Sequence, residues 1–267
     1  MLLSDLDIMR ELIDGENIMI HPLKLENIKG SSINLTASKF AWRVTNGESA
    51  ISENSITIPP HETVCIYTEE SIWVSRRIGG TYHSKVSQVS KGLGHISTTL
   101  DPQWLGLSLI AVNNPTSQSI HIPIGTTFVS LMLSYLESPS TKGKNENAPS
   151  RQDLSSKFKQ TPEIEEFLRK DSNRSYDGLK KAMINSEGYK ELTKEKEDLS
   201  KKKIEFRNTF WFPLITALIA AIVGGVISGL IVWNIQSSQK PEPSDTKNSS
   251  SQTIEESSRL TTLFIIK

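Results

Sequence analysis

The chain has 267 residues, with 30 basic and 30 acidic side chains and a formal net charge of zero. This length provides for one sizeable domain with appendages or for two small domains. A neutral chain lacks the basic excess that binding to a nucleic acid backbone requires, so we expect no nucleic acid partner. The single cysteine, Cys65, excludes an internal disulfide, and no Cys/His cluster has the spacing of a structural zinc site.

The first 135 residues contain one predicted helix and many short β-prone segments. Ser4 is suited to cap the helix, Asp5 and Asp7 fall in its first turn, and Gly15 follows its end. The predicted strands lie at residues 18–20, 32–35, 55–58, 63–67, 71–74, 107–112, 119–122 and 127–133. Turn signals separate them at residues 29–30, 59–60, 79–80, 113–115 and 124–125. Many short strands at close spacing predict a mainly β domain, an antiparallel barrel or jelly-roll.

Two charged segments follow this domain. Residues 136–160 have the composition of a polar linker, and residues 161–208 that of a charged helical stalk. Leu192, Leu199 and Phe206 recur every seven residues, which is typical of a short coiled coil. A solvated stalk without a partner helix is the alternative.

Residues 209–235 are predicted to form a transmembrane helix. They contain no charged side chain, and the apolar run is long enough to cross a hydrocarbon core of about 30 Å. Phe210, Trp211 and Trp233 stand at its two ends, as interfacial aromatic residues do. Basic residues are more numerous just before the run than after it, which predicts a cytoplasmic N-terminal domain. The Ser/Thr-rich tail at residues 236–267 is predicted to be disordered.

Short motifs in the first 135 residues carry a family resemblance. In chain order they are Met1-Leu2-Leu3-Ser4-Asp5-Leu6-Asp7-Ile8, Ile20-His21-Pro22, Glu26-Asn27-Ile28-Lys29-Gly30-Ser31, Ile58-Pro59-Pro60-His61-Glu62, Ser84-Lys85-Val86-Ser87 with Gly92-Leu93, Leu100-Asp101-Pro102-Gln103-Trp104-Leu105-Gly106, and Pro123-Ile124-Gly125. Their order and spacing resemble the dCTP deaminase/dUTPase superfamily, and the sixth resembles its "I-D-P-G-[FW]-x-G". The resemblance implies a dUTPase-like distorted β-barrel or jelly-roll that binds a pyrimidine nucleotide. It also implies a homotrimer with its sites between subunits.

The same resemblance assigns nucleotide and phosphate contacts to four residues, Lys85, Ser87, Gln88 and Trp104. Lys85 stands where the family has an arginine, so it supplies a point charge without the bidentate fork of a guanidinium. Trp104 either stacks on a sugar or fills the core. Departures elsewhere in the loop, such as Ser130 in place of a family glutamine, weaken the expected triphosphate site.

Deaminase chemistry is expected to be lost. The family glutamate lies ten residues after the motif aspartate, and counting from Asp101 places Ala111 there. A methyl group cannot carry a proton between water and a cytosine ring. Asp101 itself is retained, and it is either the catalytic residue of a dUTPase or an ordinary turn residue. No cofactor is implied unless a triphosphate is hydrolysed, when Mg²⁺ is expected.

Four further residues near these motifs have open roles. His83 and His95 flank the phosphate loop, where each is either a phosphate contact or base, or a structural residue. Arg76 and Arg77 are either ordinary surface residues or an extension of a phosphate-binding rim.

Three hypotheses about function stay open. The first is a membrane-anchored dCTP deaminase/dUTPase-like protein that binds a (deoxy)pyrimidine nucleotide as a sensor or receptor, with its deaminase chemistry lost. The second is an active deoxypyrimidine triphosphate enzyme, either a dUTP diphosphatase or a dCTP deaminase. The third is a purely structural trimeric scaffold.

Overall fold

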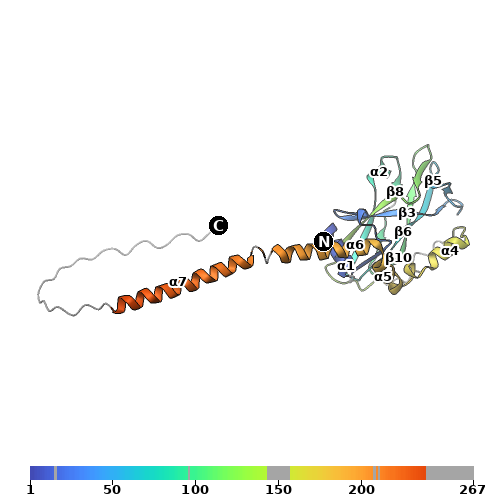
Figure 1. Cartoon of the computed structure of the whole chain (residues 1–267). Coiled ribbons are helices and arrows are strands. Elements are labelled where there is room, and N and C mark those ends of the chain that lie inside the picture. Colours follow the sequence, from blue (N-terminus) through green and yellow to red (C-terminus); the bar gives the residue numbers. More distant parts are fainter. Residues whose placement is uncertain (15–16, 96, 143–156, 207–208, 210, 239–267) are drawn as a thin grey trace, which may run out of the picture. The chain divides into compact units, whose positions relative to one another are not determined.

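The computed structural model describes residues 1–14, 17–95, 97–142, 157–206, 209 and 211–238 (Figure 1). The chain divides into two compact units, Met1–Lys202 and Lys203–Lys267, which we treat separately. The predicted tail from residue 239 onward and most of the predicted linker lie outside the described residues.

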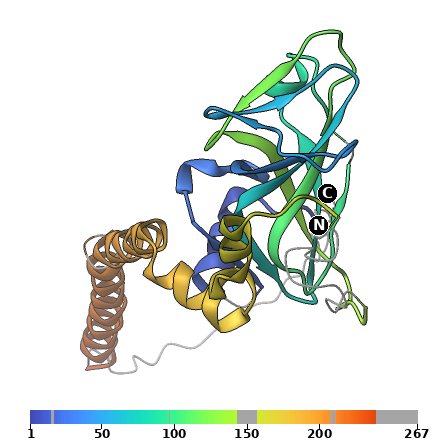
Figure 2. The same ribbon diagram turned by 90° about the vertical axis from the view of Figure 1, so that its right-hand side faces the viewer.

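The first unit is built on antiparallel strands. They are β1 (Ile18–His21), β2 (Ile28–Lys29), β3 (Ser32–Arg43), β4 (Ile51–Ser52), β5 (Ser55–Ile58), β6 (Thr63–Val74), β7 (Ile78–Ser84), β8 (Gly94–His95), β9 (Thr99–Leu100), β10 (Leu105–Asn113), β11 (Ile120–Pro123) and β12 (Thr127–Tyr135). The main sheet has the order β8-β10-β6-β3-β12-β7-β9, with β1 paired to β6 and β2 to β3. A second sheet has the order β11-β5-β4. Figure 2 shows that the main sheet is curled. Buried apolar side chains of its strands form the larger of two core clusters. The predicted mainly β antiparallel fold is confirmed.

Strand β6 differs from the prediction because polar residues interrupt its apolar pattern. Two short strands were expected at residues 63–67 and 71–74, whereas one strand runs through Thr63–Val74. Thr68 and Glu70, in the middle of this strand, are buried and have partners: the Thr68 hydroxyl donates to the Glu70 carbonyl at 2.8 Å. Buried polar groups that find hydrogen bonds are compatible with a strand interior.

Strand β7 was missed because Gly79-Gly80 reads as a turn. In the structure Gly80 lies opposite Leu133 of β12 within an unbroken ladder. A Cβ atom added to Gly80 would come within 2.8 Å of the Met132 carbonyl oxygen. The glycine therefore permits close approach of two strands, which is one of the recognised uses of glycine inside a strand.

The first helix, α1 (Asp5–Asp14), begins as the sequence predicts. The Ser4 hydroxyl accepts a hydrogen bond from the Asp7 backbone N–H at 3.2 Å, and Asp7 Oδ2 accepts one from the Ser4 backbone N–H at 3.1 Å. This reciprocal arrangement is a capping box, with aspartate in place of the usual glutamate or glutamine. Ile8 and Leu12, on the inner face of the helix, are completely buried in the core.

Helices in the predicted stalk region pack on the β domain. They are α4 (Pro162–Arg169), α5 (Tyr176–Asn185) and α6 (Glu187–Phe206). Leu179 and Met183 of α5 and Leu192 of α6 are buried in the same core as the strands. Leu192, the first member of the heptad stripe, is thus occupied by intramolecular packing, and the side chains of Leu199 and Phe206 lie outside the described residues.

A second apolar cluster attaches α4 to the sheet. Ile164 and Leu168 are 1% and 3% exposed and pack with Phe40 and Trp42 of β3. The rings of Trp42 and Phe158 are stacked, with centroids 5.3 Å apart. The structure therefore places residues 158–192 within the first unit, where they add to its core.

A substitution at Ser175, the N-cap residue of α5, tests whether this helix contributes to the stability of the first unit. Ser175 accepts a hydrogen bond from the Gly178 backbone N–H at 3.0 Å and donates one to Asp171 Oδ1 at 2.6 Å. We expect Ser175→Ala to lower the free energy of unfolding of residues 1–202 by about 1 kcal/mol, the usual cost of losing an N-cap. Chemical denaturation measures it, with the exposed Lys181→Ala as control. An unchanged free energy would mean that α5 frays before the domain unfolds.

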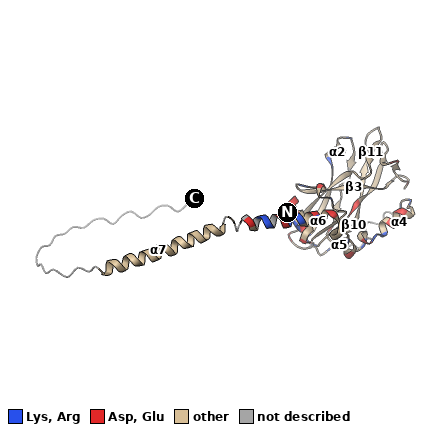
Figure 3. Ribbon diagram, in the orientation of Figure 1, with Lys and Arg blue, Asp and Glu red and all other residues tan. Residues whose placement is uncertain are grey.

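The described part of the second unit is dominated by α7 (Phe212–Ser238). It is long and apolar enough to cross a membrane by length and composition. Figure 3 shows no Lys, Arg, Asp or Glu along it, in contrast to the mixed charges on α6. The long apolar C-terminal helix expected from the sequence is thus present.

Candidate functional site

Lys85 lies in the turn between β7 and the short helix α2 (Val86–Val89). Its ammonium group donates a hydrogen bond to Thr127 Oγ1 at the start of β12. Partial burial and the positive charge of Lys29 both lower the pKa of Lys85, burial being the larger cause. Lys29 is not among the residues that the sequence assigns to the site, and its positive charge adds to the electrostatic field at the Lys85 ammonium group.

The other loop residues assigned to phosphate differ in accessibility. Ser87 is exposed, so its hydroxyl is free to face a ligand. Gln88 is 6% exposed, and its side-chain Oε1 has no hydrogen-bond partner among the described residues. Its backbone carbonyl accepts from the N–H groups of Lys91 and Leu93, which closes the loop around it. Gln88 thus lies inside the loop and supports its shape.

Asp101 is exposed on the turn between β9 and β10. Its backbone carbonyl accepts from the Trp104 N–H at 3.1 Å, and Oδ1 accepts from the Thr99 hydroxyl at 3.3 Å. Burial raises the pKa of the nearby Tyr82 phenol, and the charge of Asp101 raises it further. Trp104 is partly buried against the core and donates from Nε1 to the Gly106 carbonyl at 3.1 Å, which is the packing role considered for it.

Ala111 lies within β10, paired with Cys65 of β6. Burial raises the pKa of the Cys65 thiol, so this thiol stays protonated at neutral pH. Neither side chain supplies a carboxylate at the position where the resemblance places the family glutamate.

Lys85 and Asp101 lie on different turns of the first unit, directly after β7 and directly after β9. Among the described residues, no hydrogen bond or ion pair connects Lys85 with Asp101. The Lys85 ammonium group donates to Thr127, and the Asp101 carboxylate accepts from Thr99. His83 is exposed, and its Nε2 lies 2.7 Å from Thr81 Oγ1. The side chain of His95 lies outside the described residues.

A metal centre made of protein ligands is absent from the described part of the chain. No group of three His, Cys, Asp or Glu side chains there is placed to hold a metal ion. Mg²⁺ commonly binds through one or two carboxylates together with substrate phosphates. Exposed Asp101 fits that donor set only with a triphosphate present.

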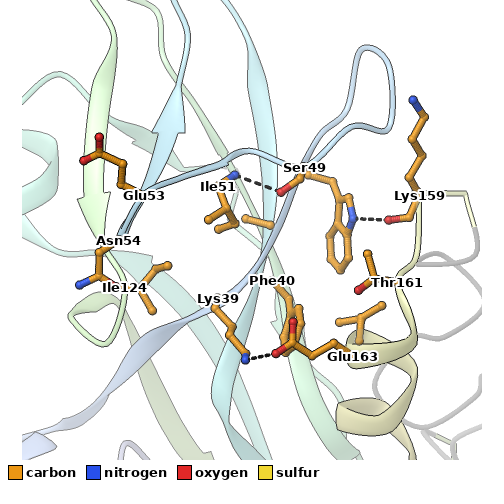
Figure 4. Close-up of a pocket in the computed structure, with 13 residues that line it drawn as sticks. Lys39, Phe40, Ser49, Ile51, Glu53, Asn54, Ile124, Lys159, Thr161 and Glu163 are labelled. Atoms are coloured by element: carbon orange, nitrogen blue, oxygen red, sulfur yellow. Dashed lines mark hydrogen bonds and ion pairs between the residues drawn. The ribbon is translucent and has the colours of Figure 1, made fainter.

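A separate pocket of about 400 Å³ lies between β3, the 49–54 segment and the start of α4 (Figure 4). Lys39 forms an ion pair with Glu163 across its edge, and the Trp42 Nε1 donates to the Lys159 carbonyl at 2.9 Å. The residues assigned to nucleotide binding do not line this pocket. It is a consequence of how α4 covers the sheet.

Comparison with known proteins identifies the class to which the β domain is related. No protein-family model matches the chain. The chain is 27% identical to dCTP deaminase of Thermococcus kodakarensis over 142 residues, covering 52% of this chain and 86% of that protein. It is 24% identical to dCTP deaminase of Pyrococcus horikoshii over 139 residues, covering 52% and 85%. These similarities confirm the predicted resemblance to the dCTP deaminase/dUTPase superfamily.

Solved structures give matches of the same kind at lower identity. The dCTP deaminase of Agrobacterium tumefaciens matches 49% of this chain and 46% of its own, with 13% identity and a TM-score of 0.41. The EIAV dUTPase matches 49% of this chain and 98% of its own, with 19% identity and a TM-score of 0.36. The dUTPase of the S. aureus phage phi11, described with a structural Mg(II) ion, matches 48% and 95%, with 13% identity and a TM-score of 0.35.

Proposed function

We propose that the β domain binds a deoxypyrimidine nucleotide without deaminating it, as the sensor or receptor part of a membrane-anchored protein. The observation that carries this proposal is Ala111 on β10, with Cys65 as its cross-strand neighbour. Sequence similarity to dCTP deaminases supports a nucleotide-related role. The absence of a proton-carrying side chain at Ala111 argues against the family reaction.

The chemistry explains why this substitution matters. Deamination of cytosine needs a group that takes a proton from water and delivers it to the ring and the leaving amine. Alanine has no ionisable proton, and the Cys65 thiol, whose pKa is raised by burial, is a poor base at neutral pH. Nucleotide binding needs no proton-transfer group, so the domain keeps its ability to bind the nucleotide when it no longer deaminates it.

Phosphate recognition falls to the loop around Lys85. The Lys85 ammonium group lies in the positive field of Lys29, and the described residues show no carboxylate paired with either lysine. Unpaired cations of this kind attract a polyphosphate. We propose that a homotrimer completes the site, bringing Asp101 of one subunit to the Lys85 loop of another. Any Mg²⁺ would then enter with the triphosphate.

A second candidate function rests on Asp101. Its carboxylate is exposed on a hydrogen-bonded turn, in the arrangement that the superfamily resemblance associates with dUTP hydrolysis. A positioned carboxylate is suited to orient and activate a water molecule. This alternative keeps the nucleotide site and adds cleavage between phosphates.

Nucleotide titration of the full chain in detergent tests the proposal. We expect dCTP or dUTP, with Mg²⁺, to bind with saturable heat and to be recovered unchanged. Release of dUMP and pyrophosphate from dUTP would establish the second candidate. Deoxyuridine products from dCTP would contradict the argument from Ala111. Absence of binding by any nucleoside triphosphate would leave the scaffold hypothesis.

Membrane anchoring by α7 is a separate prediction. We expect the full chain to stay with membranes during alkaline extraction, because a helix of this length and composition is stable in a bilayer. A variant lacking residues 209–235 should appear in the soluble fraction. Protease added to intact cells should leave the β domain uncut if that domain is cytoplasmic. Extraction of the full chain by carbonate would contradict the anchor.

A further inference from the structure

A second pocket is lined by none of the residues assigned to the nucleotide site. It has a volume of about 420 Å³. It lies where the β6–β7 turn, the start of β1, the 101–104 turn and the 136–140 segment meet. Its lining consists of Asn17, Trp73, Ser75, Arg76, Arg77, Gln103 and Pro139. Two arginine residues thus line one cavity, and its lining, as far as the described residues define it, includes no acidic residue.

The turn that carries the two arginines is firmly held. The Ser75 N–H donates to the Asn17 carbonyl at 2.9 Å, and the Ser75 hydroxyl donates to Asn17 Oδ1 at 2.6 Å. The Arg77 N–H donates to the Ser75 hydroxyl at 3.0 Å, and the Ser140 N–H to the Arg76 carbonyl at 2.8 Å. A turn fixed at so many points presents its side chains in a defined place, which lowers the entropy cost of binding.

Both arginines keep donors available for a ligand. Arg76 uses Nε to donate to the Ser140 carbonyl at 2.9 Å, which orients its side chain and leaves the two terminal amino groups. Arg77 has no side-chain hydrogen bond or ion pair among the described residues. A planar fork of N–H donors matches the oxygen atoms of a phosphate group.

Gln103 supplies an independent indication. Its backbone φ is +64°, in the left-handed region that non-glycine residues seldom occupy. In the motif that residues 100–106 resemble, this position is glycine. Gln103 thus combines an unfavourable backbone conformation with a position at the pocket wall. Within the described residues no side-chain hydrogen bond engages this amide, so it is available to a ligand.

We propose that this pocket is a binding site for the phosphate group of a small phosphorylated molecule. Arg76 and Arg77 bind the phosphate oxygens, Gln103 donates from its amide, and the partly exposed Trp73 ring forms a wall for the rest of the ligand. Gln103 is also hydrogen-bonded to the turn that carries the two arginines, since its N–H donates to the Ser75 carbonyl at 3.4 Å. A ligand here consequently contacts the turn that bears Asp101, two residues away.

Pyrophosphate is the probe for this site, used with the full chain in detergent and calorimetry as the readout. The Lys85→Ala background removes the proposed nucleotide contact, so it separates the two sites. In this background we expect pyrophosphate to bind, and Arg76→Ala/Arg77→Ala to weaken it at least about tenfold, the effect of losing charge-assisted hydrogen bonds. Arg169→Ala, which removes an exposed arginine of α4 that does not line the pocket, is the matched control.

The variant Gln103→Gly tests whether the Gln103 side chain binds the ligand or is only tolerated at this position. Glycine suits the left-handed backbone, so we expect the melting temperature to stay the same or rise while pyrophosphate affinity falls several-fold. Unchanged affinity in the double arginine variant, or no binding in the Lys85→Ala background, would overturn the proposal. A further result would be arginine-dependent binding to phosphatidylglycerol vesicles without binding of pyrophosphate. That result would identify a lipid headgroup as the source of the phosphate, and it would overturn the proposal of a small soluble ligand.

Discussion

Lys85→Ala is expected to weaken binding of the nucleoside triphosphate at least about tenfold. A charge-assisted hydrogen bond to phosphate contributes about 1.5–3 kcal/mol, which corresponds to roughly ten- to a hundred-fold in the dissociation constant. The lysine is partly buried, and the lower effective dielectric there makes its charge act more strongly on an anion than that of a fully exposed lysine. Calorimetric titration of the full chain in detergent measures the change.

Matched variants isolate the contribution of the ammonium group. Lys91→Ala removes an exposed lysine of the same loop and should leave the affinity unchanged. Thr127→Val removes the intramolecular partner of Lys85 but not its charge, so it should change affinity only slightly. Lys85→Arg restores the family residue and should bind at least as tightly, since a guanidinium adds bidentate contact. Wild-type affinity in Lys85→Ala would place the phosphates elsewhere.

The sequence predicted the parts of the fold that depend on local patterns. Ser4 and Asp7 formed the expected cap, because capping is decided within four residues. The turn at Ile124-Gly125 lies between β11 and β12, where Gly125 has a φ of +80°. The Gly79-Gly80 pair predicts a turn, but it lies inside β7. Gly80 permits close contact with β12, which follows about fifty residues later in the chain.

Structural features that depend on residues far apart in the sequence could not be predicted from local patterns. The stalk composition concealed Leu179 and Met183, because a charged segment with a few apolar residues looks the same whether those residues meet a core or water. The effect of the Lys29 charge on Lys85 could not be predicted either, since these two lysines are more than fifty residues apart in the sequence. The assignment of Asp101 and Lys85 to one site comes from family resemblance, and it stays a prediction that requires the homotrimer we propose.

Glu70→Gln is expected to remove the fall in stability that Glu70 causes between pH 4.5 and pH 7. Glu70 is 1% exposed within β6, and its carboxyl oxygens accept from the Thr36 N–H at 2.9 Å and the Thr36 hydroxyl at 2.7 Å. Burial raises the pKa of this carboxyl from 4.5 to about 7, and the hydrogen bonds from Thr36 oppose the rise. Burial dominates because two neutral donors replace only part of the hydration of a carboxylate.

The direction of the effect follows from proton counting. Between pH 4.5 and pH 7 the folded chain keeps the Glu70 proton while the unfolded chain has lost it, so the free energy of unfolding falls as the pH rises. The loss is complete above about pH 7 and amounts to on the order of 3 kcal/mol. Glutamine stays neutral and retains one oxygen acceptor for Thr36, so the variant should show little slope from this position and exceed the wild type in stability at pH 8.

Urea denaturation of residues 1–202, which contain both apolar clusters, compares the two proteins from pH 4.5 to pH 8. Glu69→Gln is the matched control: Glu69 is the adjacent residue of β6, is partly exposed and pairs with Lys24 at 3.5 Å, so the variant should keep most of the wild-type slope. Equal slopes in wild type and Glu70→Gln would mean that Glu70 is ionised in the folded state at neutral pH. Thr36 would then hold a buried carboxylate, and Thr36→Val would be the more damaging substitution because it leaves that charge without donors.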